Sequence, residues 1–367
     1  MTIEIVIKMF ILIFLSYFTI RLFIKYAPQL GLLDKPNHRS AHKTPTPRGA
    51  GIVFGALFLI ALAFQGIECI SLNIYVIIAT IMVYVVGIVD DFKTLEAKTK
   101  LMVIIAATLL LYMGGYEIDS IGTYFGHEIT LGWLALPFTV FAVVAFTNAV
   151  NLTDGLDGLA GSISLVIAST IFFIGVVHDD TTLIYWSAFL IAVLIGFLFL
   201  NWHPAKVFMG DSGSLFLGFI IAVLALQAFE YVSPTAILFF AAMPILDTLI
   251  VFRRRIQRGM SPFTPDKNHI HHVLFNAKQD KAFTVKMLLT MQIAFSALFL
   301  QLYNQNDLLN LLTFVLLFIL FFNLFDPRIR KRPKGAIIRK KHKEEIAKKK
   351  KNKKKQIDSN SQIEKSK

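Results

Sequence analysis

Charged residues are scarce in this chain: only 17% of its 367 residues are Asp, Glu, Lys or Arg, against about 25% in an average soluble domain. Hydrophobic residues make up 55% and stand in long runs. The single cysteine, Cys69, excludes a disulfide framework and a zinc site built from cysteines. These shortages argue against a disordered chain, a disulfide scaffold and a soluble α/β enzyme. They predict an all-α, polytopic membrane protein, because backbone polar groups in lipid must pair within their own segment.

The apolar runs are long enough to cross a membrane, which takes about 20 residues of helix. We predict eleven transmembrane helices, near residues 3–25, 50–67, 73–89, 100–115, 132–150, 158–177, 183–200, 213–230, 235–252, 284–303 and 308–325. No small-residue cleavage pattern follows the first run, so we expect it to be retained as a span. Residues 116–131 alternate and contain glycines, which predicts a small β-hairpin on the outer surface.

Basic residues are absent from Leu101 to Ala205, and the loops on one side of the predicted membrane carry only acidic charges. The positive-inside rule therefore places the N-terminus outside and the C-terminus in the cytoplasm. Residues 326–367 hold 18 Lys and Arg but 5 Asp and Glu, which equals the whole net charge of +13. We expect residues 1–325 to form an integral membrane catalytic domain and 326–367 a disordered cytoplasmic tail. Anionic membrane lipids would attract that tail, whereas nucleic acid is not an expected partner.

The chemistry-bearing motifs all lie in the predicted cytoplasmic loops, near residues 34–48, 90–100, 151–157, 201–211 and 253–282. A transporter should instead show polar groups that meet near the midplane. The one-sided arrangement favours an enzyme whose substrate arrives from the cytosol. A transporter of a lipid-linked or nucleotide sugar is the alternative from another class.

Two carboxylates, Asp90 and Asp91, end the third predicted span. Adjacent carboxylates at a membrane boundary are costly to desolvate, so we expect them to face a wet cavity or a cation. A solvated helix end is the alternative.

A second motif, Asn-Leu-Thr-Asp-Gly-Leu-Asp-Gly, follows the fifth predicted span. Its polar members Asn151, Asp154 and Asp157 are spaced by three residues, which places them on one face if the segment is helical. We expect Thr153 or Asp154 to cap the next helix and to present its positive end to an anion. A plain capped loop is the alternative.

Asp211 is predicted to begin the eighth span, where a carboxylate is a natural ligand for magnesium and the helix N-terminus faces the cytosol. Phe208 is suited to stacking on a base, with simple packing as the alternative. His269, His271 and His272 lie in the longest predicted cytoplasmic loop. No acidic or cysteine partner has zinc-ligand spacing, so hydrogen bonding and charge neutralisation at phosphate is favoured. Together the motifs predict metal-assisted phosphoryl transfer with a lipid co-substrate.

In order and spacing, these motifs resemble those of the polyprenyl-phosphate N-acetylhexosamine-1-phosphate transferases, glycosyltransferase family 4, over about residues 30–280. The run His-Ile-His-His at 269–272 is similar to the branch that uses UDP-GlcNAc, whereas the muramoyl-pentapeptide branch carries three consecutive histidines. The resemblance implies transfer of GlcNAc-1-phosphate from UDP-GlcNAc to undecaprenyl phosphate, giving undecaprenyl-diphospho-GlcNAc and UMP. Another UDP-HexNAc or UDP-MurNAc-pentapeptide is the alternative donor.

The resemblance also implies a multi-pass enzyme of the bacterial cytoplasmic membrane with a cytoplasmic active site. Its product would initiate a cell-surface polysaccharide of O-antigen, common-antigen or teichoic-acid type. A homodimer is compatible with it. Mg²⁺ is the implied cofactor, with Mn²⁺ expected as a substitute. Asp211 would bind the metal with the help of Asn151.

Further roles are implied only by the resemblance. Asp90 or Asp91 would orient or deprotonate the lipid phosphate, and Lys100 would bind the pyrophosphate. Asp157 and Phe208 match uracil-binding positions, and Asp154 is counted with them as substrate-binding. The three histidines, His269, His271 and His272, match the phosphate and sugar end, and Lys43 lies in a similar first-loop motif. Both a direct attack of the lipid phosphate on the β-phosphorus and a double displacement through an aspartate stay open.

Overall fold

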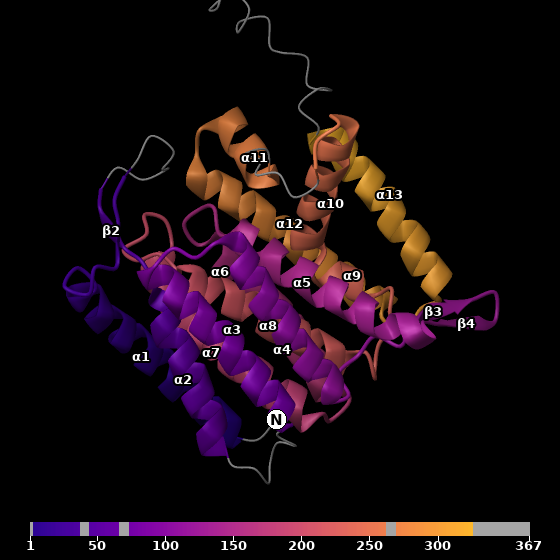
Figure 1. Cartoon of the computed structure of the whole chain (residues 1–367), viewed down its shortest axis with the longest axis horizontal. Coiled ribbons are helices and arrows are strands. Elements are labelled where there is room, and N and C mark those ends of the chain that lie inside the picture. Colours follow the sequence, from indigo (N-terminus) through magenta and orange to yellow (C-terminus); the bar gives the residue numbers. More distant parts are fainter. Residues whose placement is uncertain (1–2, 37–43, 66–72, 262–268, 326–367) are drawn as a thin grey trace, which may run out of the picture. The chain divides into compact units, whose positions relative to one another are not determined.

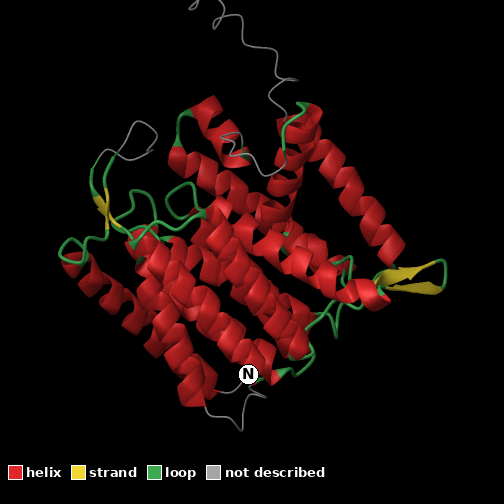
Figure 2. Ribbon diagram, in the orientation of Figure 1, coloured by secondary structure: helices red, strands yellow, loops and turns green. Residues whose placement is uncertain are grey.

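The computed structural model describes residues 3–36, 44–65, 73–261 and 269–325. Regular structure in these residues is almost entirely helical (Figure 2), which confirms the all-α prediction. Eight helical segments in the described part are long and apolar enough to cross a membrane. They are α1 (Ile3–Tyr26), α3 (Ile74–Phe92), α5 (Ala135–Thr153) with the short 3-10 helix η1 (Gly132–Leu134) before it, α6 (Leu159–Val177), α7 (Thr181–Asn201), α8 (Asp211–Ala228), α12 (Lys281–Leu302) and α13 (Asp307–Phe325).

The predicted number of eleven spans is not confirmed. Helices α2 (Ala50–Gln65) and α4 (Ala97–Met113) match predicted spans but are shorter, with 16 and 17 residues. The predicted span 235–252 is divided between α9 (Ile237–Phe240) and α10 (Ala242–Gln257).

Pro244 gives the physical reason for this division, because it has no N–H to donate to the carbonyl of Phe240. The side chain of Gln292 on α12 repairs the break. Its Nε2 donates to the Phe240 carbonyl at 2.6 Å, and its Oε1 accepts from the Met243 N–H at 3.2 Å. The buried amide of Gln292 and the two backbone groups left unpaired at the break thus satisfy one another's hydrogen bonds.

Helix α8 is the centre of the helical packing. It lies against α2, α3 and α5, while α7 packs against α1 and α6. In the 18-residue apolar stretch of α8, 83% is buried inside the protein, whereas the corresponding figure for α1 is 22%. The side chains of α8 therefore pack against protein, whereas most of α1 is left to face lipid.

The connections that carry the predicted motifs lie together at one end of the helices. Strands β1 (Leu33–Asp34) and β2 (Thr46–Pro47) pair antiparallel there, and α11 (Ile270–Lys278) lies at the same end, opposite the N-terminus (Figure 1). Strands β3 (Ser120–Tyr124) and β4 (His127–Thr130) form the predicted hairpin.

The chain from Met1 to Phe321 forms one compact unit. The second unit begins at Phe322, and its described part is only the end of α13. The predicted tail 326–367 lies outside the described residues.

Candidate active site

Four of the predicted site residues meet although they come from four different helices. The ammonium of Lys100, in the first turn of α4, lies 2.5 Å from Oδ2 of Asp211 and 3.3 Å from Oδ1 of Asp90. Asn151, near the end of α5, donates to Oδ1 of Asp211 at 3.4 Å and to Ser214 Oγ at 2.7 Å. Packing of α3, α4 and α5 around the start of α8 brings these side chains together.

Asp90 sits where α3 ends and the chain turns into α4. Its Oδ1 accepts the N–H of Leu95 at 2.7 Å, which fixes the turn as well as the carboxylate. Its carboxyl group also contacts that of Asp211. Two carboxyl groups this close need a shared proton or a cation, and Lys100 supplies one positive charge between them.

Asp91 has a different environment from its neighbour. Both carboxylate oxygens accept backbone N–H groups at the start of α8, from Asp211 at 2.9 Å and Ser212 at 3.1 Å. The N–H groups of a helix's first turn have no partner within the helix, and a carboxylate there also stabilises the helix dipole. The first N–H groups of α8 are therefore already bound to the Asp91 carboxylate.

The oxygen donors of this cluster fit a magnesium ion. Magnesium is usually held by one or two carboxylates together with substrate phosphates. Asp90 and Asp211 supply two carboxylates, and the amide of Asn151 adjoins them. Within the described residues no group of three or more His, Cys, Asp or Glu side chains is arranged to hold a metal by itself. Two carboxylates and one amide leave the remaining coordination positions of a magnesium ion to substrate phosphate or water.

Asn151, Asp154 and Asp157 would share one face only if the segment were helical, and it is not. Helix α5 ends at Thr153, so only Asn151 is helical, and Asp154 is the C-cap residue. The predicted cap of the next helix is wrong: the N-cap of α6 is Gly158, with a φ of 79° and no side-chain cap bond. The glycines of the motif favour a turn over a continued helix.

Asp154, in this turn, is close enough to the cluster for its pKa to respond to the charges there. Burial raises the pKa of Asp154 from 3.8 to about 7, and the negative charges of Asp211, Asp91 and Asp157 add to the rise. A group with such a pKa changes its charge near neutral pH, which is frequent at functional sites.

Asp157 joins three segments through one carboxylate oxygen. Its Oδ2 lies 2.7 Å from Nδ1 of His203, in the α7–α8 connection, and 3.5 Å from the ammonium of Lys281, which starts α12. Burial raises the pKa of Asp157, but the His203 hydrogen bond and the Lys281 charge outweigh it and hold the pKa below 3.8. Asp157 is therefore ionised and holds its loop between the His203 imidazole and the Lys281 ammonium.

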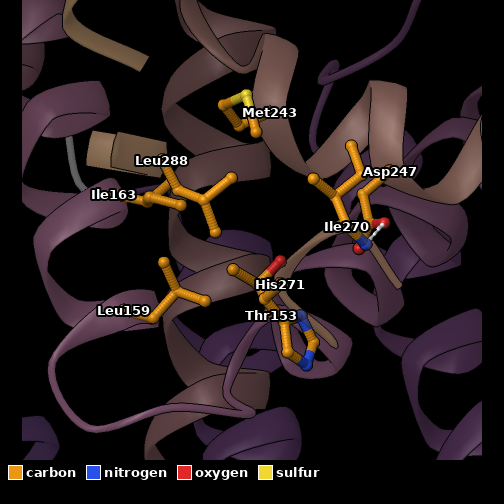
Figure 3. Close-up of a pocket in the computed structure, with 8 residues that line it drawn as sticks. All are labelled: Thr153, Leu159, Ile163, Met243, Asp247, Ile270, His271 and Leu288. Atoms are coloured by element: carbon orange, nitrogen blue, oxygen red, sulfur yellow. Dashed lines mark hydrogen bonds between the residues drawn. The ribbon is translucent and has the colours of Figure 1, made fainter. Parts of the chain in front are cut away.

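The histidine motif forms the N-terminal turn of α11 and packs on the same loop. Asp247 of α10 accepts from His269 Nδ1 at 2.9 Å and from the Ile270 N–H at 2.7 Å, the bond drawn in Figure 3. His271 lines a cavity of about 10 Å³ beside Thr153 (Figure 3). A Cβ at Gly155 would lie 2.3 Å from His271 Nε2, so the imidazole rests directly on the loop.

Charge neutralisation at phosphate stays a prediction for these histidines, and burial opposes it at His271. Burial lowers its pKa to about 3, although Asp247 opposes the shift. The imidazole is neutral at physiological pH, and its Nε2 has no hydrogen-bond partner among the described residues. His271 can donate or accept one hydrogen bond but brings no positive charge. His272 is half-buried, with its ring 4.2 Å from that of His271.

Phe208 lies at the edge of the cluster. Its N–H donates to the Pro47 carbonyl at 2.8 Å, and its carbonyl accepts from the Ala50 N–H at 3.1 Å, so the segment between α1 and α2 runs alongside it. The half-buried ring is compatible with base stacking. Lys43, predicted in the same loop, lies outside the described residues.

Sequence reasoning missed several basic side chains at this site. Arg48, in Pro-Arg-Gly-Ala-Gly, donates from Nη2 to the backbone carbonyl of Asp91 at 2.9 Å. His203 and Lys281 bind Asp157, as described above. Arg48 and His203 stand beside prolines and glycines, which mark turns, but spacing alone does not pair them with a carboxylate that is distant in the chain.

Comparisons with known proteins agree with the geometry. Residues 73–229 match the family model described as glycosyl transferase family 4. The chain is 36% identical over 258 residues to a probable undecaprenyl-phosphate N-acetylglucosaminyl 1-phosphate transferase of Bacillus subtilis, covering 68% of this chain and 71% of the relative. It is 35% and 34% identical over 265 residues to the undecaprenyl-phosphate alpha-N-acetylglucosaminyl 1-phosphate transferases of Salmonella typhi and Escherichia coli K12, covering 69% of this chain and 71% of each. The chain therefore belongs to glycosyl transferase family 4, with the polyprenyl-phosphate N-acetylhexosamine-1-phosphate transferases.

Proposed function

We propose that this protein transfers GlcNAc-1-phosphate from UDP-GlcNAc to undecaprenyl phosphate, at the cytoplasmic face of a bacterial cell membrane. An oxygen of the lipid phosphate attacks the β-phosphorus of the donor. The bond from that phosphorus to the bridging oxygen breaks, and UMP leaves with the oxygen. The relatives named above are all described as undecaprenyl-phosphate N-acetylglucosaminyl 1-phosphate transferases, which supports both substrates.

The observation that carries the proposal is the position of Lys100 between Asp90 and Asp211. Phosphoryl transfer needs positioning and charge stabilisation more than covalent help from the protein. The Lys100 ammonium can exchange its ion pairs with the carboxylates for contacts with a bound diphosphate. Asn151 holds Asp211 from the other side and keeps its carboxylate aimed at Lys100.

Asp90, Asp211 and Asn151 are the residues that we expect to hold Mg²⁺, with Mn²⁺ as a substitute. The metal, when bound, would neutralise charge on the diphosphate and on the departing UMP. The cluster without a diphosphate already neutralises part of its own charge through Lys100, so substrate and metal are expected to bind together.

An apolar cavity of about 500 Å³ supports a lipid acceptor. Its walls come from α5, α8, α9 and α10, the first two of which also carry Asn151 and Asp211. Phe146 and Ala149 line it near the end of α5, and Ile245, Leu249 and Phe252 line it along α10. An isoprenoid chain in this cavity would keep its phosphate near the cytoplasmic ends of these helices.

A direct displacement agrees better with the site than a two-step route. An aspartate nucleophile needs a free carboxylate oxygen, and both oxygens of Asp91 already accept backbone hydrogen bonds. Asp90 Oδ1 accepts from the Leu95 N–H and lies 3.3 Å from the Lys100 ammonium, and the Asp90 carboxyl group also contacts that of Asp211. A phosphate monoester is anionic at neutral pH, so the acceptor needs alignment more than deprotonation.

The proposal is tested with purified protein in detergent, Mg²⁺, undecaprenyl phosphate and each UDP-sugar in turn, by measuring UMP release. We expect UMP and a lipid-linked product with UDP-GlcNAc, and loss of both with EDTA or in Asp211→Ala. Turnover with UDP-MurNAc-pentapeptide instead would contradict the assigned donor. Folded protein that releases UMP from no donor would contradict the proposed reaction and favour a transporter.

A further inference from the structure

We propose that Arg48 and Asp91 are positioning residues, which hold the start of α8 so that Asp211 stays aimed at Lys100. The kinetic part of this inference rests on the proposed function; the structural part does not. Neither residue was placed in this role by the motif pattern, in which Asp91 stands as a catalytic group.

The first link joins α3 to α8 through Asp91. Its side chain is only 4% exposed, and each carboxylate oxygen accepts one N–H, from Asp211 and from Ser212. The carboxylate thus holds the backbone of Asp211 itself. Hydrogen bonds from N–H to an ionised carboxylate are stronger than those between neutral groups, so this contact restrains the turn from which the Asp211 side chain projects.

The turn before α8 has no spare room. Gly210 has a φ of 76°, and a Cβ at this position would lie 2.5 Å from Oδ2 of Asp91. Only glycine combines that backbone conformation with so close a carboxylate. The carboxylate of Asp91 and the backbone of Gly210 therefore fix each other.

The second link joins the segment between α1 and α2 to the same aspartate. Arg48 Nη2 donates to the carbonyl of Asp91, one of the last four carbonyls of α3, which lack a partner within the helix. A guanidinium at a helix C-terminus is also favoured by the helix dipole. The backbone of Arg48 forms a parallel bridge with Phe208, so the residue is attached both to α3 and to the segment that leads into α8.

The guanidinium of Arg48 is only partly satisfied by hydrogen bonds. Its Nε is buried and has no hydrogen-bond partner in the described part of the chain. Burying an unpaired donor is costly, so the guanidinium would not stay there without a compensating contact. The Asp91 carbonyl supplies one such contact. A shift of the segment between α1 and α2 would therefore move the end of α3 and, through Asp91, the backbone of Asp211.

The test compares Arg48→Met, Arg48→Lys and Asp91→Asn with the full-length wild type, and uses Lys93→Met as the matched control. Lys93 is exposed and follows the same end of α3. The first readout is amide hydrogen exchange of the peptide that contains Asp211 and Ser212, which needs no activity. The second readout is the rate of UMP release at varied UDP-GlcNAc concentration, which gives kcat and the KM for UDP-GlcNAc separately.

We expect faster exchange at the start of α8 in Arg48→Met and Asp91→Asn. We also expect kcat to fall about 10- to 100-fold with little change in KM, because a small displacement of a catalytic group costs that much. Arg48→Lys should recover part of both, since a cation remains at the helix end, and Lys93→Met should match the wild type.

Unchanged exchange at the start of α8 in both Arg48→Met and Asp91→Asn would overturn the proposal. So would a raised KM with unchanged exchange, which would make Arg48 a substrate contact. A wild type that releases no UMP would contradict the proposed function alone, because the exchange experiment still decides whether Arg48 and Asp91 hold Asp211.

Discussion

The ammonium of Lys100 lies 2.5 Å from Asp211 Oδ2, although 111 residues separate the two in the chain. Lys100 stands in the first turn of α4, where the helix dipole disfavours a positive charge. The carboxylates of Asp211 and Asp90 offset this cost. The charged groups of the site are thus already held in place by one another before any substrate is bound.

Replacement of Lys100 by Met should lower kcat about 100- to 1,000-fold, because a preorganised charge aimed at the diphosphate stabilises the transition state strongly. The measurement is UMP release with saturating Mg²⁺ and UDP-GlcNAc. Lys98→Met is the control, since Lys98 is exposed in the same helical turn. Equal losses in both variants would mean that general positive charge, and not the Lys100 position, matters.

Asp154 should make the stability of the folded protein depend on pH. Its pKa is raised from 3.8 to about 7, so the folded state binds the proton more tightly than the unfolded state. Wild-type stability should therefore fall, relative to Asp154→Asn, as pH rises from about 4 to about 7, and the difference should then stay constant. Thermal unfolding in detergent with EDTA measures it. A Tm difference that does not change with pH would contradict the raised pKa.

The contact between Gly155 and His271 predicts a non-additive pair of substitutions. Gly155→Ala should lower Tm, because the new Cβ would lie 2.3 Å from the buried imidazole nitrogen. The same change in an His271→Ala background should cost little, since the space is then open. Thermal unfolding of the four proteins gives the coupling. Additive effects would show that the loop does not rest on His271.

The contacts of Asp157 predict a shift in acid stability. Its pKa lies below 3.8, so the ionised carboxylate stabilises the folded state above that pH, and the stabilisation is lost as pH falls through the lowered pKa. Lys281→Met removes one opposing cation and should move this loss to higher pH, with a cost of about 1 kcal/mol near neutrality. Unfolding between pH 3 and pH 7 measures the shift.

Asp157→Asn provides the control for this prediction. In that background Lys281→Met should have no further effect, because the carboxylate that it stabilises is gone. A similar loss in both backgrounds would assign Lys281 to another partner.

Local patterns in the sequence predict the helical class and the hairpin, and the resemblance to the family brings Asp90, Lys100, Asn151 and Asp211 into one site. Pro244 itself signals a break in the predicted span, but an apolar run gives no sign that Gln292 from α12 will replace the missing backbone bond.

The roles of individual side chains were harder to predict than their positions. Asp90 and Asp91 look alike in the sequence, but only Asp91 meets the start of α8. The neutral state of His271 follows from burial between α10, α11 and the 154–158 loop, which no spacing rule contains. These differences arise from contacts between segments far apart in the chain.

The most direct test of the account uses UDP-GlcNAc labelled in its β-phosphate, with purified protein, Mg²⁺ and undecaprenyl phosphate. If GlcNAc-1-phosphate is transferred, the label should move to the lipid phase in proportion to the UMP formed, and the UMP should be unlabelled. Label that stays in water-soluble UDP while the sugar appears on the lipid would contradict the account, because the sugar would then have moved without its phosphate.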